Sequence, residues 1–354
     1  MKKIGIITVY ETENTGSVLQ ATALKNVVEA MGYSVLFIST KNRYSVHSLK
    51  CLTKSIVKAV IRRNRVRDCW TKYWYYEHYI NHTFQTILPE NVPVEGLETI
   101  IIGSDTVWDV ASKYFEESCG TFWALDWMDI PIVTYAATIA NTAYSKLNEL
   151  RYPEDALKRY KAISVRDQYT EGYIEAKLGR KVPIVCDPTL LLPAEYYRKK
   201  CFKVEERYLL LYLFDELKGS VKQEVRRFAN KKGLKIISLG KHILGSDQWV
   251  SGTIENFLSY FDSAEYIITN TFHGTVFSIL FNKSFVSLDY NKNKVTELMC
   301  GFELSKRLIS CNVSAVLEQR IDYSRINKQI IKMRNESMQF LRKELIPGGK
   351  LVWD

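Results

Sequence analysis

The clearest structural signal in the chain is the stretch Ile267-Ile268-Thr269-Asn270-Thr271-Phe272-His273-Gly274-Thr275-Val276-Phe277-Ser278-Ile279-Leu280-Phe281. A short apolar run ends at three small polar residues, which are followed by a histidine and a glycine. Beyond Gly274 the apolar residues recur with the spacing of a helix that buries one face. The stretch therefore predicts a buried strand, a tight turn and the start of a helix, with His273 at the junction.

His273 is a candidate for anion chemistry because of this position. The first backbone N–H groups of a helix have no partner within the helix and carry partial positive charge, so anions bind there. A histidine beside such a site can donate a hydrogen bond to a bound anion or transfer a proton to it. The alternative is that His273 only caps the helix or fills the turn.

The first half of the chain predicts a parallel sheet. Residues 4–9 form an apolar strand, the polar loop 10–17 follows it, and a helical pattern leads from there to a second strand at 35–38. Strand, loop, helix and strand make a βαβ unit. Further strands are predicted at 99–102, 132–137 and 162–167, and the segment 182–189 closes this half. The loop 10–17 lacks the glycine patterns that bind dinucleotides or nucleotide phosphates.

A second alternating set begins after the predicted linker 193–195. Its predicted strands are 208–213, 234–239, 266–268 and 284–288, its predicted helices are 221–231 and 254–261, and a long charged helix follows at 323–345. The chain is therefore interpreted as an N-terminal α/β domain, residues 1–195, and a C-terminal α/β domain, residues 196–354. The predicted fold class is α/β, with two Rossmann-like doubly wound domains that face a cleft.

Length and composition limit the classes of function. The 354 residues suit two domains, and the seven scattered cysteines indicate a reducing compartment without a disulfide framework or zinc site. No apolar run is long enough to span a membrane, so the prediction is a cytoplasmic protein. The formal charge of +10 is concentrated in residues 50–72, which predict either a solvated helix face or peripheral contact with the inner face of an anionic membrane. No nucleic-acid-binding module accompanies this charge.

Two charged residues follow central strands of the N-terminal half. Asp105 comes just after the strand 99–102, where a carboxylate can take a proton from a substrate hydroxyl; the alternative is that it caps the next helix. Arg166 ends the strand 162–167, where a guanidinium can hold a carboxylate or phosphate through two hydrogen bonds. The alternative for Arg166 is an ion pair with its neighbour Asp167.

Six short segments together resemble the polysaccharide pyruvyl transferase family. The similarity covers nearly the whole chain, and its segments occur in the family's order. They are Asn14-Thr15-Gly16-Ser17-Val18-Leu19-Gln20-Ala21, Gly103-Ser104-Asp105-Thr106-Val107-Trp108, Tyr135-Ala136-Ala137, Ser164-Val165-Arg166-Asp167, Asp187-Pro188-Thr189-Leu190-Leu191 and Thr271-Phe272-His273-Gly274.

The resemblance implies a glycosyltransferase-B-like fold and the transfer of pyruvate from phosphoenolpyruvate to two hydroxyls of a sugar. It implies that Arg166 holds the donor and that His273 is an acid/base or donor-binding residue. Many family members carry arginine two residues before this histidine, where this chain has Thr271. The missing charge is then expected from Lys292 or Lys294.

The resulting prediction is a transferase without a cofactor or metal, with phosphoenolpyruvate as donor and a sugar or lipid-linked oligosaccharide as acceptor. His273 is the candidate acid and Asp105 the candidate base. The candidate donor-binding residues are Arg166, Thr271, Gly274, Thr275, Lys292 and Lys294. The candidate acceptor-binding residues are Asn14, Gly16, Ser17, Trp108 and Asp167. The alternatives are a nucleotide-sugar-dependent glycosyltransferase of the same architecture and a glycan- or coenzyme-binding protein without chemistry.

Overall fold

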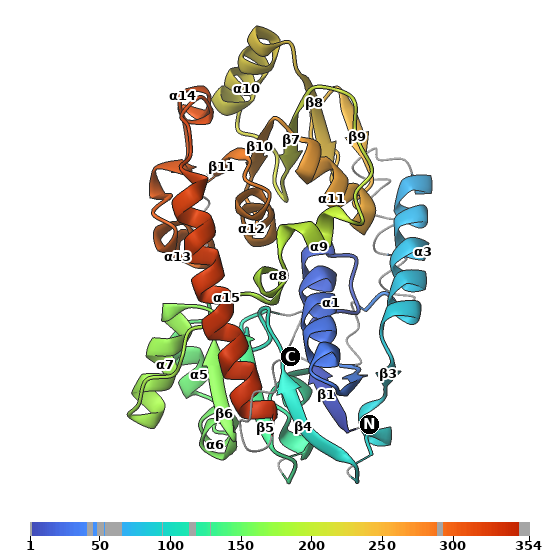
Figure 1. The fold of residues 1–354 in the computed structure, drawn as a ribbon, viewed down its shortest axis with the longest axis vertical. Coiled ribbons are helices and arrows are strands. Elements are labelled where there is room, and N and C mark those ends of the chain that lie inside the picture. Colours follow the sequence, from blue (N-terminus) through green and yellow to red (C-terminus); the bar gives the residue numbers. More distant parts are fainter. Residues whose placement is uncertain are drawn as a thin grey trace, which may run out of the picture. The chain divides into compact units, whose positions relative to one another are not determined.

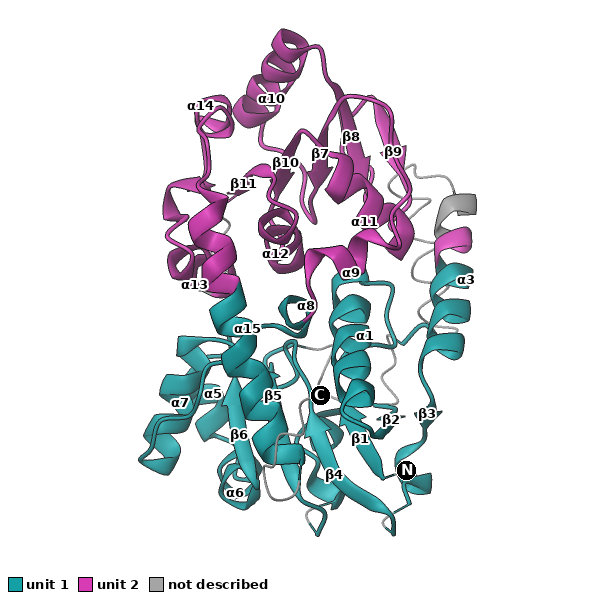
Figure 2. Ribbon diagram, in the orientation of Figure 1, with its two compact units in different colours: residues 1–58, 73–191, 331–354 teal, residues 59–72, 192–330 magenta. Residues whose placement is uncertain are grey.

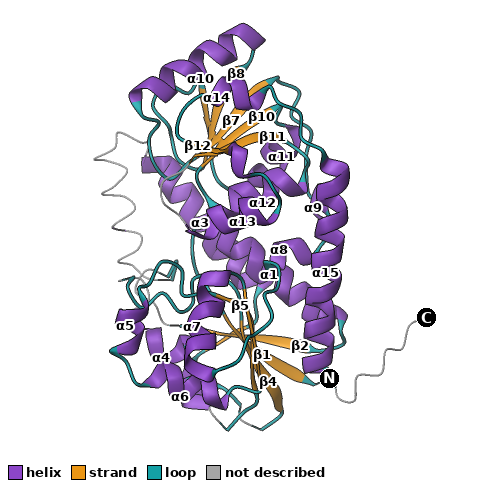
Figure 3. Cartoon of the chain, turned by 90° about the vertical axis from the view of Figure 1, so that its left-hand side faces the viewer, coloured by secondary structure: helices purple, strands orange, loops and turns teal. Residues whose placement is uncertain are grey.

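The computed structural model describes residues 2–40, 45–47, 53, 66–93, 95–112, 118–127, 129–288 and 293–346. Within these residues the strands form two parallel six-stranded sheets, each with helices on both faces (Figures 1 and 3). The chain divides into two compact units (Figure 2). Unit 1 comprises Met1–Lys58, Tyr73–Leu191 and Ile331–Asp354, and unit 2 comprises Ala59–Lys72 and Leu192–Ile330. The predicted fold class of two doubly wound α/β domains is confirmed.

The sheet of unit 1 has the strand order β3-β2-β1-β4-β5-β6. Ile6 in β1 is paired with Phe37 in β2 on one side and with Ile101 in β4 on the other. The order therefore changes direction between β1 and β4, which is where ligands bind in sheets of this kind. The strands are β1 (Lys3–Ile7), β2 (Ser34–Ile38), β3 (Thr86–Ile87), β4 (Leu97–Ile102), β5 (Ile132–Ala137) and β6 (Ala162–Val165).

The helices of this half connect successive strands and cover the sheet. They are α1 (Thr15–Ala30), α3 (Val66–Thr83), α4 (Cys119–Phe122), α5 (Tyr144–Asn148), α6 (Tyr152–Arg159), α7 (Gln168–Leu178) and α8 (Pro188–Leu191), with short 3₁₀ turns at Pro89–Asn91 and Leu125–Trp127. The apolar strands are buried on both faces, so they read in the sequence as continuous apolar runs rather than as alternating patterns.

The sheet of unit 2 has the strand order β12-β11-β10-β7-β8-β9, with its change of direction between β7 and β10. Ile268 in β10 is paired with Leu211 in β7 and with Val286 in β11. The strands are β7 (Tyr208–Tyr212), β8 (Lys235–Leu239), β9 (Gln248–Val250), β10 (Tyr266–Thr269), β11 (Ser284–Leu288) and β12 (Leu308–Ile309).

Helices that follow these strands enclose a second apolar core. They are α9 (Ala194–Arg198), α10 (Gly219–Lys232), α11 (Ile254–Ser263), α12 (Phe272–Leu280), α13 (Asn293–Gly301), α14 (Val313–Leu317) and α15 (Tyr323–Leu345), with a 3₁₀ turn at Ser305–Arg307. The core is built from β7, β8, β10 and β11 on one side and from α10 and α14 on the other. The stretch 267–281 therefore forms a strand (β10), a turn and a helix (α12), as predicted.

The last helix, α15, begins in unit 2 and ends in unit 1. In unit 2, the hydroxyl of Tyr323 donates to the carbonyl of Ser278. In unit 1, Arg334 Nε donates to the carbonyl of Leu190, and Ser337 Oγ accepts from the backbone N–H of Cys186. Whereas the sequence places the domain boundary at residue 195, the compact units separate at residue 191 and the end of α15 belongs with unit 1, because its hydrogen bonds are made there.

The edges of the sheets differ most from the sequence-based prediction. The short strands β3, β9 and β12 have no apolar run long enough to predict them. The segment 182–189 contributes only a single bridge, between Val165 and Ile184, and α8 follows. The predicted linker 193–195 lies at the start of α9. Most of the basic segment 50–72 lies outside the described residues. Among the residues that are described, no helix is long and apolar enough to cross a membrane.

Candidate functional site

Three predicted acceptor-binding residues lie at the start of α1, which follows β1 at the change of strand direction in unit 1. Asn14 precedes α1 and caps it, because its side chain accepts a hydrogen bond from the backbone N–H of Gly16. Gly16 and Ser17 are buried in the first turn of the helix. Asn14 is partly buried whereas Ser17 is buried, so the Asn14 side chain is the more accessible of the two.

Asp105 is held by two hydrogen bonds in the turn after β4. Ser17 Oγ donates to Asp105 Oδ2 at 2.6 Å, and the backbone N–H of Thr106 donates to Asp105 Oδ1 at 2.9 Å. The backbone of Asp105 is left-handed, with φ of 74°, a conformation that aspartate and asparagine adopt more readily than most residues. The structure therefore places Asp105 beside Ser17, and these two hydrogen bonds orient its carboxylate.

Arg166 is engaged in a buried ion pair with a partner that the sequence did not indicate. Its Nη1 donates to Asp187 Oδ2 at 3.0 Å, and the two side chains are only 4% and 1% exposed. Ser104 Oγ lies 3.5 Å from the same Nη1 and donates to the same carboxylate oxygen at 3.2 Å. The alternative of an ion pair with Asp167 is wrong, because the side chain of Asp167 caps α7 and accepts from the N–H of Thr170.

The predicted acceptor contact Trp108 lies in the core of unit 1. Trp108 is 1% exposed, and its ring stacks on Trp123 at 4.6 Å between ring centroids. Its indole N–H donates to the carbonyl of Phe122. Trp108 is therefore a core residue behind the turn that carries Asp105. Asp167 is 6% exposed and one of its carboxylate oxygens caps α7, so its contact with an acceptor stays a prediction.

In unit 2, His273 is the second residue of α12, immediately after β10. Thr271 caps this helix, because its Oγ1 accepts from the N–H of Gly274 at 2.9 Å. A threonine at this position therefore has a structural role of its own. His273 is 8% exposed, and its imidazole lies edge-to-face with the ring of Phe272 at the carboxyl edge of the sheet. The predicted strand, turn and helix start thus hold His273 at the ligand-binding edge of unit 2.

Gly274 is required at this turn by close packing. A Cβ atom at this position would lie 2.2 Å from Thr269 Oγ1, 2.6 Å from Thr271 Oγ1 and 2.9 Å from Tyr212 Cδ1. These distances are well inside van der Waals contact, so no larger residue fits without movement of the turn. The glycine lets α12 begin directly against β7 and β10.

The remaining predicted donor-binding residues differ in their burial. Thr275 is fully buried and its Oγ1 donates to the carbonyl of Thr271, so the side chain of Thr275 supports the turn and does not face a ligand. Lys294 is partly buried in the first turn of α13, directly after β11. Lys292 lies outside the described residues.

The structure adds a polar network that the sequence analysis missed. Asn270 Oδ1 accepts from the N–H of Phe214, and Asn270 Nδ2 donates to Asp215 Oδ2 at 3.0 Å. These contacts join the loop after β7 to the loop after β10, at the change of strand direction in unit 2. Asp215 follows an apolar strand just as Asp105 does, and that position is the signal that could have identified it.

The candidate residues form two groups. The first lies in unit 1 and contains Ser17, Asp105, Arg166 and Asp187; the second lies in unit 2 and contains His273 with its turn. Across the part of the chain that the structure describes, no three histidine, cysteine, aspartate or glutamate residues are arranged as a metal-ligand set.

Comparison with known proteins identifies the family. Residues 14–292 match the family model of polysaccharide pyruvyl transferases. The chain belongs to this family. Membership indicates a transferase, and the matched range includes both groups of candidate residues. No curated protein matches the chain.

Solved structures with similar folds include UDP-GlcNAc 2-epimerases. The UDP-GlcNAc 2-epimerase of Neisseria meningitidis bound to UDP-GlcNAc is 8% identical, with a TM-score of 0.55 over 98% of this chain and 100% of that chain. A putative UDP-N-acetylglucosamine 2-epimerase of Listeria monocytogenes is 9% identical, with a TM-score of 0.54 over 96% and 95% of the two chains. The S. aureus protein MnaA in complex with UDP is 13% identical, with a TM-score of 0.52 over both full chains. At this identity the similarity establishes the glycosyltransferase-B-like fold alone.

Proposed function

We propose that this family member transfers pyruvate from phosphoenolpyruvate to two hydroxyls of a sugar, giving a cyclic pyruvate ketal during synthesis of a surface polysaccharide or glycan. One observation carries the proposal. The segments that resemble the family are scattered from residue 14 to residue 274, yet they gather at the carboxyl ends of the strands in the two units. Ligands bind at this edge in doubly wound sheets.

The segments of unit 1 also hold one another in place. Ser17 of the first segment donates to Asp105 of the second, Ser104 of the second joins Arg166 to Asp187, and the hydroxyl of Tyr135 donates to the carbonyl of Cys186. A network that connects residues so distant in sequence, with its members buried, is costly to disturb. It supports a common site rather than unrelated structural motifs.

The reaction needs two proton transfers that suit the residues present. Proton addition to the methylene carbon of phosphoenolpyruvate makes the methyl group of the ketal. The two hydroxyl oxygens of the sugar bond to the adjacent carbon, whose bond to the phosphate oxygen breaks. Of the two hydroxyl protons, one replaces the proton used at the methylene carbon and the other leaves with phosphate. A well-placed acid or base typically contributes about 10²–10⁴-fold to such a step.

Asp105 is the proposed base on an acceptor hydroxyl, and His273 is the proposed acid or phosphate-stabilising residue. The two hydrogen bonds to Asp105 orient its carboxylate, and the capped start of α12 adds the partial positive charge of a helix terminus beside His273. Lys294, in the first turn of α13, is the described lysine that is proposed to supply a charge for the donor. Arg166 shares its charge with Asp187, so its proposed contribution is to set the shape of the carboxyl edge as well as to attract the donor.

The acceptor and its location belong to the same proposal. A sugar on a lipid-linked oligosaccharide, modified in the cytoplasm at the inner face of the membrane, fits the family and the formal charge of +10. The competing function is transfer from a nucleotide sugar, since proteins of similar fold have been solved with UDP or with UDP-GlcNAc bound.

Calorimetric titration with phosphoenolpyruvate, UDP, GDP and CDP separates the two functions. We expect saturable binding of phosphoenolpyruvate to the unmodified protein and at least ten-fold weaker binding to His273→Asn. Arg166→Ala is not a suitable variant for this test, because it leaves the buried carboxylate of Asp187 without its cation and so destabilises the protein. The control is His242→Asn, which changes a histidine of unit 2 that belongs to neither candidate group. Binding of a nucleotide alone would overturn the proposal.

A further inference from the structure

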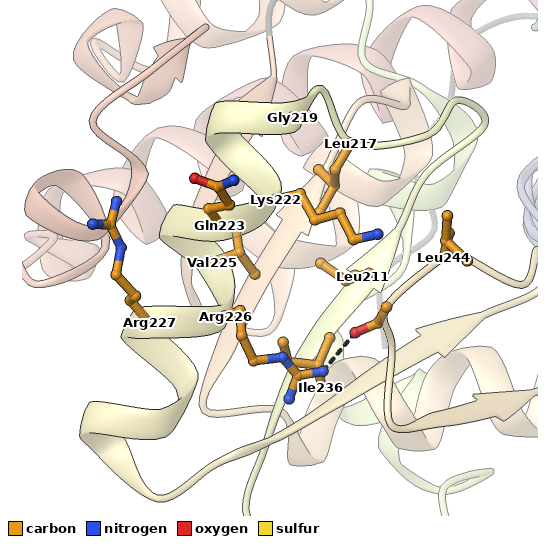
Figure 4. A pocket seen from close by; sticks show the side chains of 11 residues that line it. Leu211, Leu217, Gly219, Lys222, Gln223, Val225, Arg226, Arg227, Ile236 and Leu244 are labelled. Atoms are coloured by element: carbon orange, nitrogen blue, oxygen red, sulfur yellow. Dashed lines mark hydrogen bonds between the residues drawn. The ribbon is translucent and has the colours of Figure 1, made fainter.

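The groove beside α10 in unit 2 takes its apolar surface from the core of that unit. Its volume is about 660 Å³ (Figure 4). Leu211 and Ile236, which line it, are only 1% and 2% exposed because they belong to the apolar core. Arg226 on its rim is neutralised by an ion pair with Asp247. Among the described residues, this groove therefore indicates no class of ligand.

Unit 1 contains a fully buried amide that is linked to Asp105 by hydrogen bonds. Gln20 lies in the second turn of α1 and is 0% exposed. Its Nε2 donates to Thr8 Oγ1 at 3.0 Å, to the carbonyl of Val9 at 3.1 Å and to the carbonyl of Ser17 at 2.9 Å. One amide group therefore joins the loop after β1 to the start of α1.

Two series of hydrogen bonds lead from Gln20 to the turn that carries Asp105. In the first, Gln20 binds the carbonyl of Ser17, whose Oγ donates to Asp105 Oδ2 at 2.6 Å. In the second, Gln20 donates to Thr8 Oγ1, which itself donates to the carbonyl of Ser104 at 2.9 Å. Gln20 is thus connected both to the carboxylate of the proposed base and to the backbone beside it.

The surroundings of Gln20 Nε2 require a neutral hydrogen-bond donor. A glutamate would direct carboxylate oxygens at the carbonyl oxygens of Val9 and Ser17, and a lysine would bring an unpaired charge into a buried position. Gln20 Oε1 accepts no hydrogen bond from the described residues, so the amide is held by its donor end alone. Because a buried acceptor without a partner lowers stability, the donor end is the reason for a glutamine here.

We propose that Gln20 is a positioning residue for Asp105. Its amide holds the start of α1 against the turn after β4, so that the carboxylate keeps its direction towards an acceptor hydroxyl. Gln20 is itself buried and acts only through Ser17 and Thr8. The inference rests on the proposed function in the role that it gives to Asp105 as base. A displacement of about 1 Å at a catalytic group can cost about 10²-fold in rate, so such a residue can still limit turnover.

The first test needs no substrate. Urea unfolding of the unmodified protein, Ser17→Ala, Asp105→Gly and the double variant gives the coupling between the two side chains. Glycine is chosen because it tolerates the left-handed backbone at residue 105. The four proteins are then remade with Gln20→Met, which approximates the shape of glutamine and removes its donor. We expect the coupling to be largely lost in this background.

The second test separates the rate of reaction from binding. In Gln20→Met, kcat for ketal formation should fall by about 10–10²-fold, and KM for phosphoenolpyruvate should stay within about two-fold. Thr8→Val is a milder variant, because it removes the link to Ser104 and retains the one to Ser17. It should lower kcat less than Gln20→Met does. A loss confined to KM would contradict the role in positioning the base.

The matched control is Thr22→Val. Thr22 is also a buried polar residue of α1, but its hydroxyl donates to the carbonyl of Val18, outside both series of hydrogen bonds. This variant should leave kcat and the coupling of Ser17 to Asp105 unchanged.

The two tests distinguish failure of this inference from failure of the proposed function. If the unmodified protein forms no ketal, the proposed function is wrong; loss of the coupling in Gln20→Met would still support the positioning of Asp105. Unchanged coupling between Ser17 and Asp105, or an unchanged kcat in Gln20→Met, would each overturn the inference.

Discussion

Ser17 Oγ donates a hydrogen bond of 2.6 Å to Asp105 Oδ2, joining the first turn of α1 to the left-handed turn after β4. The two residues are 88 positions apart in sequence. Their contact spans the point where the strand order of unit 1 changes direction. It gives Asp105 a fixed orientation at the edge where a substrate is expected, and this makes the carboxylate the most testable catalytic candidate.

Asp105→Asn should abolish turnover without unfolding the protein. Asparagine tolerates the left-handed backbone of this turn and can still exchange hydrogen bonds with Ser17 and the N–H of Thr106, but it cannot accept a substrate proton. We expect ketal formation to fall by about 10²–10⁴-fold, the usual contribution of a general base. The loss is measured as the rate of product formation, which is monitored through the release of phosphate.

Ser17→Ala is a second variant that tests the orientation of the Asp105 carboxylate separately from its charge. It retains the carboxylate and removes the hydrogen bond that orients it, so its activity should lie between that of the unmodified protein and that of Asp105→Asn. If Asp105→Asn turned over substrate at the normal rate, the assignment of Asp105 as base would be wrong.

The fold could be predicted because its central strands are continuous apolar runs. Ile132–Ala137 and Ser284–Leu288 form the predicted strands because each is buried almost throughout its length, and the chain leaves each at polar or small residues. The edge strands β3 and β12 could not be predicted. They have two residues each, and their pairing depends on the neighbouring strand rather than on their own sequence.

The sequence indicated that the candidate residues follow strands, but it did not indicate which side chains they bond to. Polar residues after apolar strands marked Asp105, Arg166 and His273, because strand ends are local features of the sequence. The partner of Arg166 is Asp187, 21 residues away, and the neighbouring Asp167 is used as a helix cap instead. Such a choice depends on tertiary packing. The same packing buries Trp108, which the sequence had placed among the acceptor-binding candidates.

Gly274→Ala should destabilise the protein by about 1–3 kcal/mol, the usual cost of an overpacked position. The new methyl group would collide with Thr269 Oγ1, which is held by its own hydrogen bond to the carbonyl of Tyr212. Urea unfolding measures the change. The control is Gly120→Ala, where a Cβ atom comes no closer than 4.0 Å to Leu125 and helix propensity favours alanine. A Gly274→Ala protein as stable as the Gly120→Ala protein would contradict the packing argument.

Arg166 and Asp187 should show strong coupling in a double-mutant cycle. Removal of one partner leaves a buried charge without compensation, so Arg166→Met and Asp187→Leu should each cost about 3–5 kcal/mol in the free energy of unfolding. The double variant should cost much less than the sum, because neither charge then remains. Urea unfolding of the four proteins gives the coupling energy. Additive losses would show that the ion pair contributes little.

Alkylation should distinguish Cys186 from the exposed cysteines. Burial raises the pKa of the Cys186 thiol to about 11, and the thiolate is the reactive form. Because the pKa is raised, Cys186 remains a protonated thiol where exposed cysteines ionise. In native protein at about pH 8.5, iodoacetamide should therefore modify Cys300 and Cys311 and leave Cys186 unmodified, and this protection should persist as the exposed thiols ionise more fully at about pH 10.

Peptide mass spectrometry after timed labelling measures this difference, and labelling in urea supplies the control, since unfolding returns Cys186 to an ordinary pKa and exposes it. Protection of Cys186 also reports on unit 1 as a whole. Its backbone N–H donates to Ser337 of α15 and its carbonyl accepts from Tyr135 of β5, so the end of α15 must stay docked while the thiol is protected. Labelling of Cys186 as fast as Cys300 in native protein would show that the end of α15 is not held in this position.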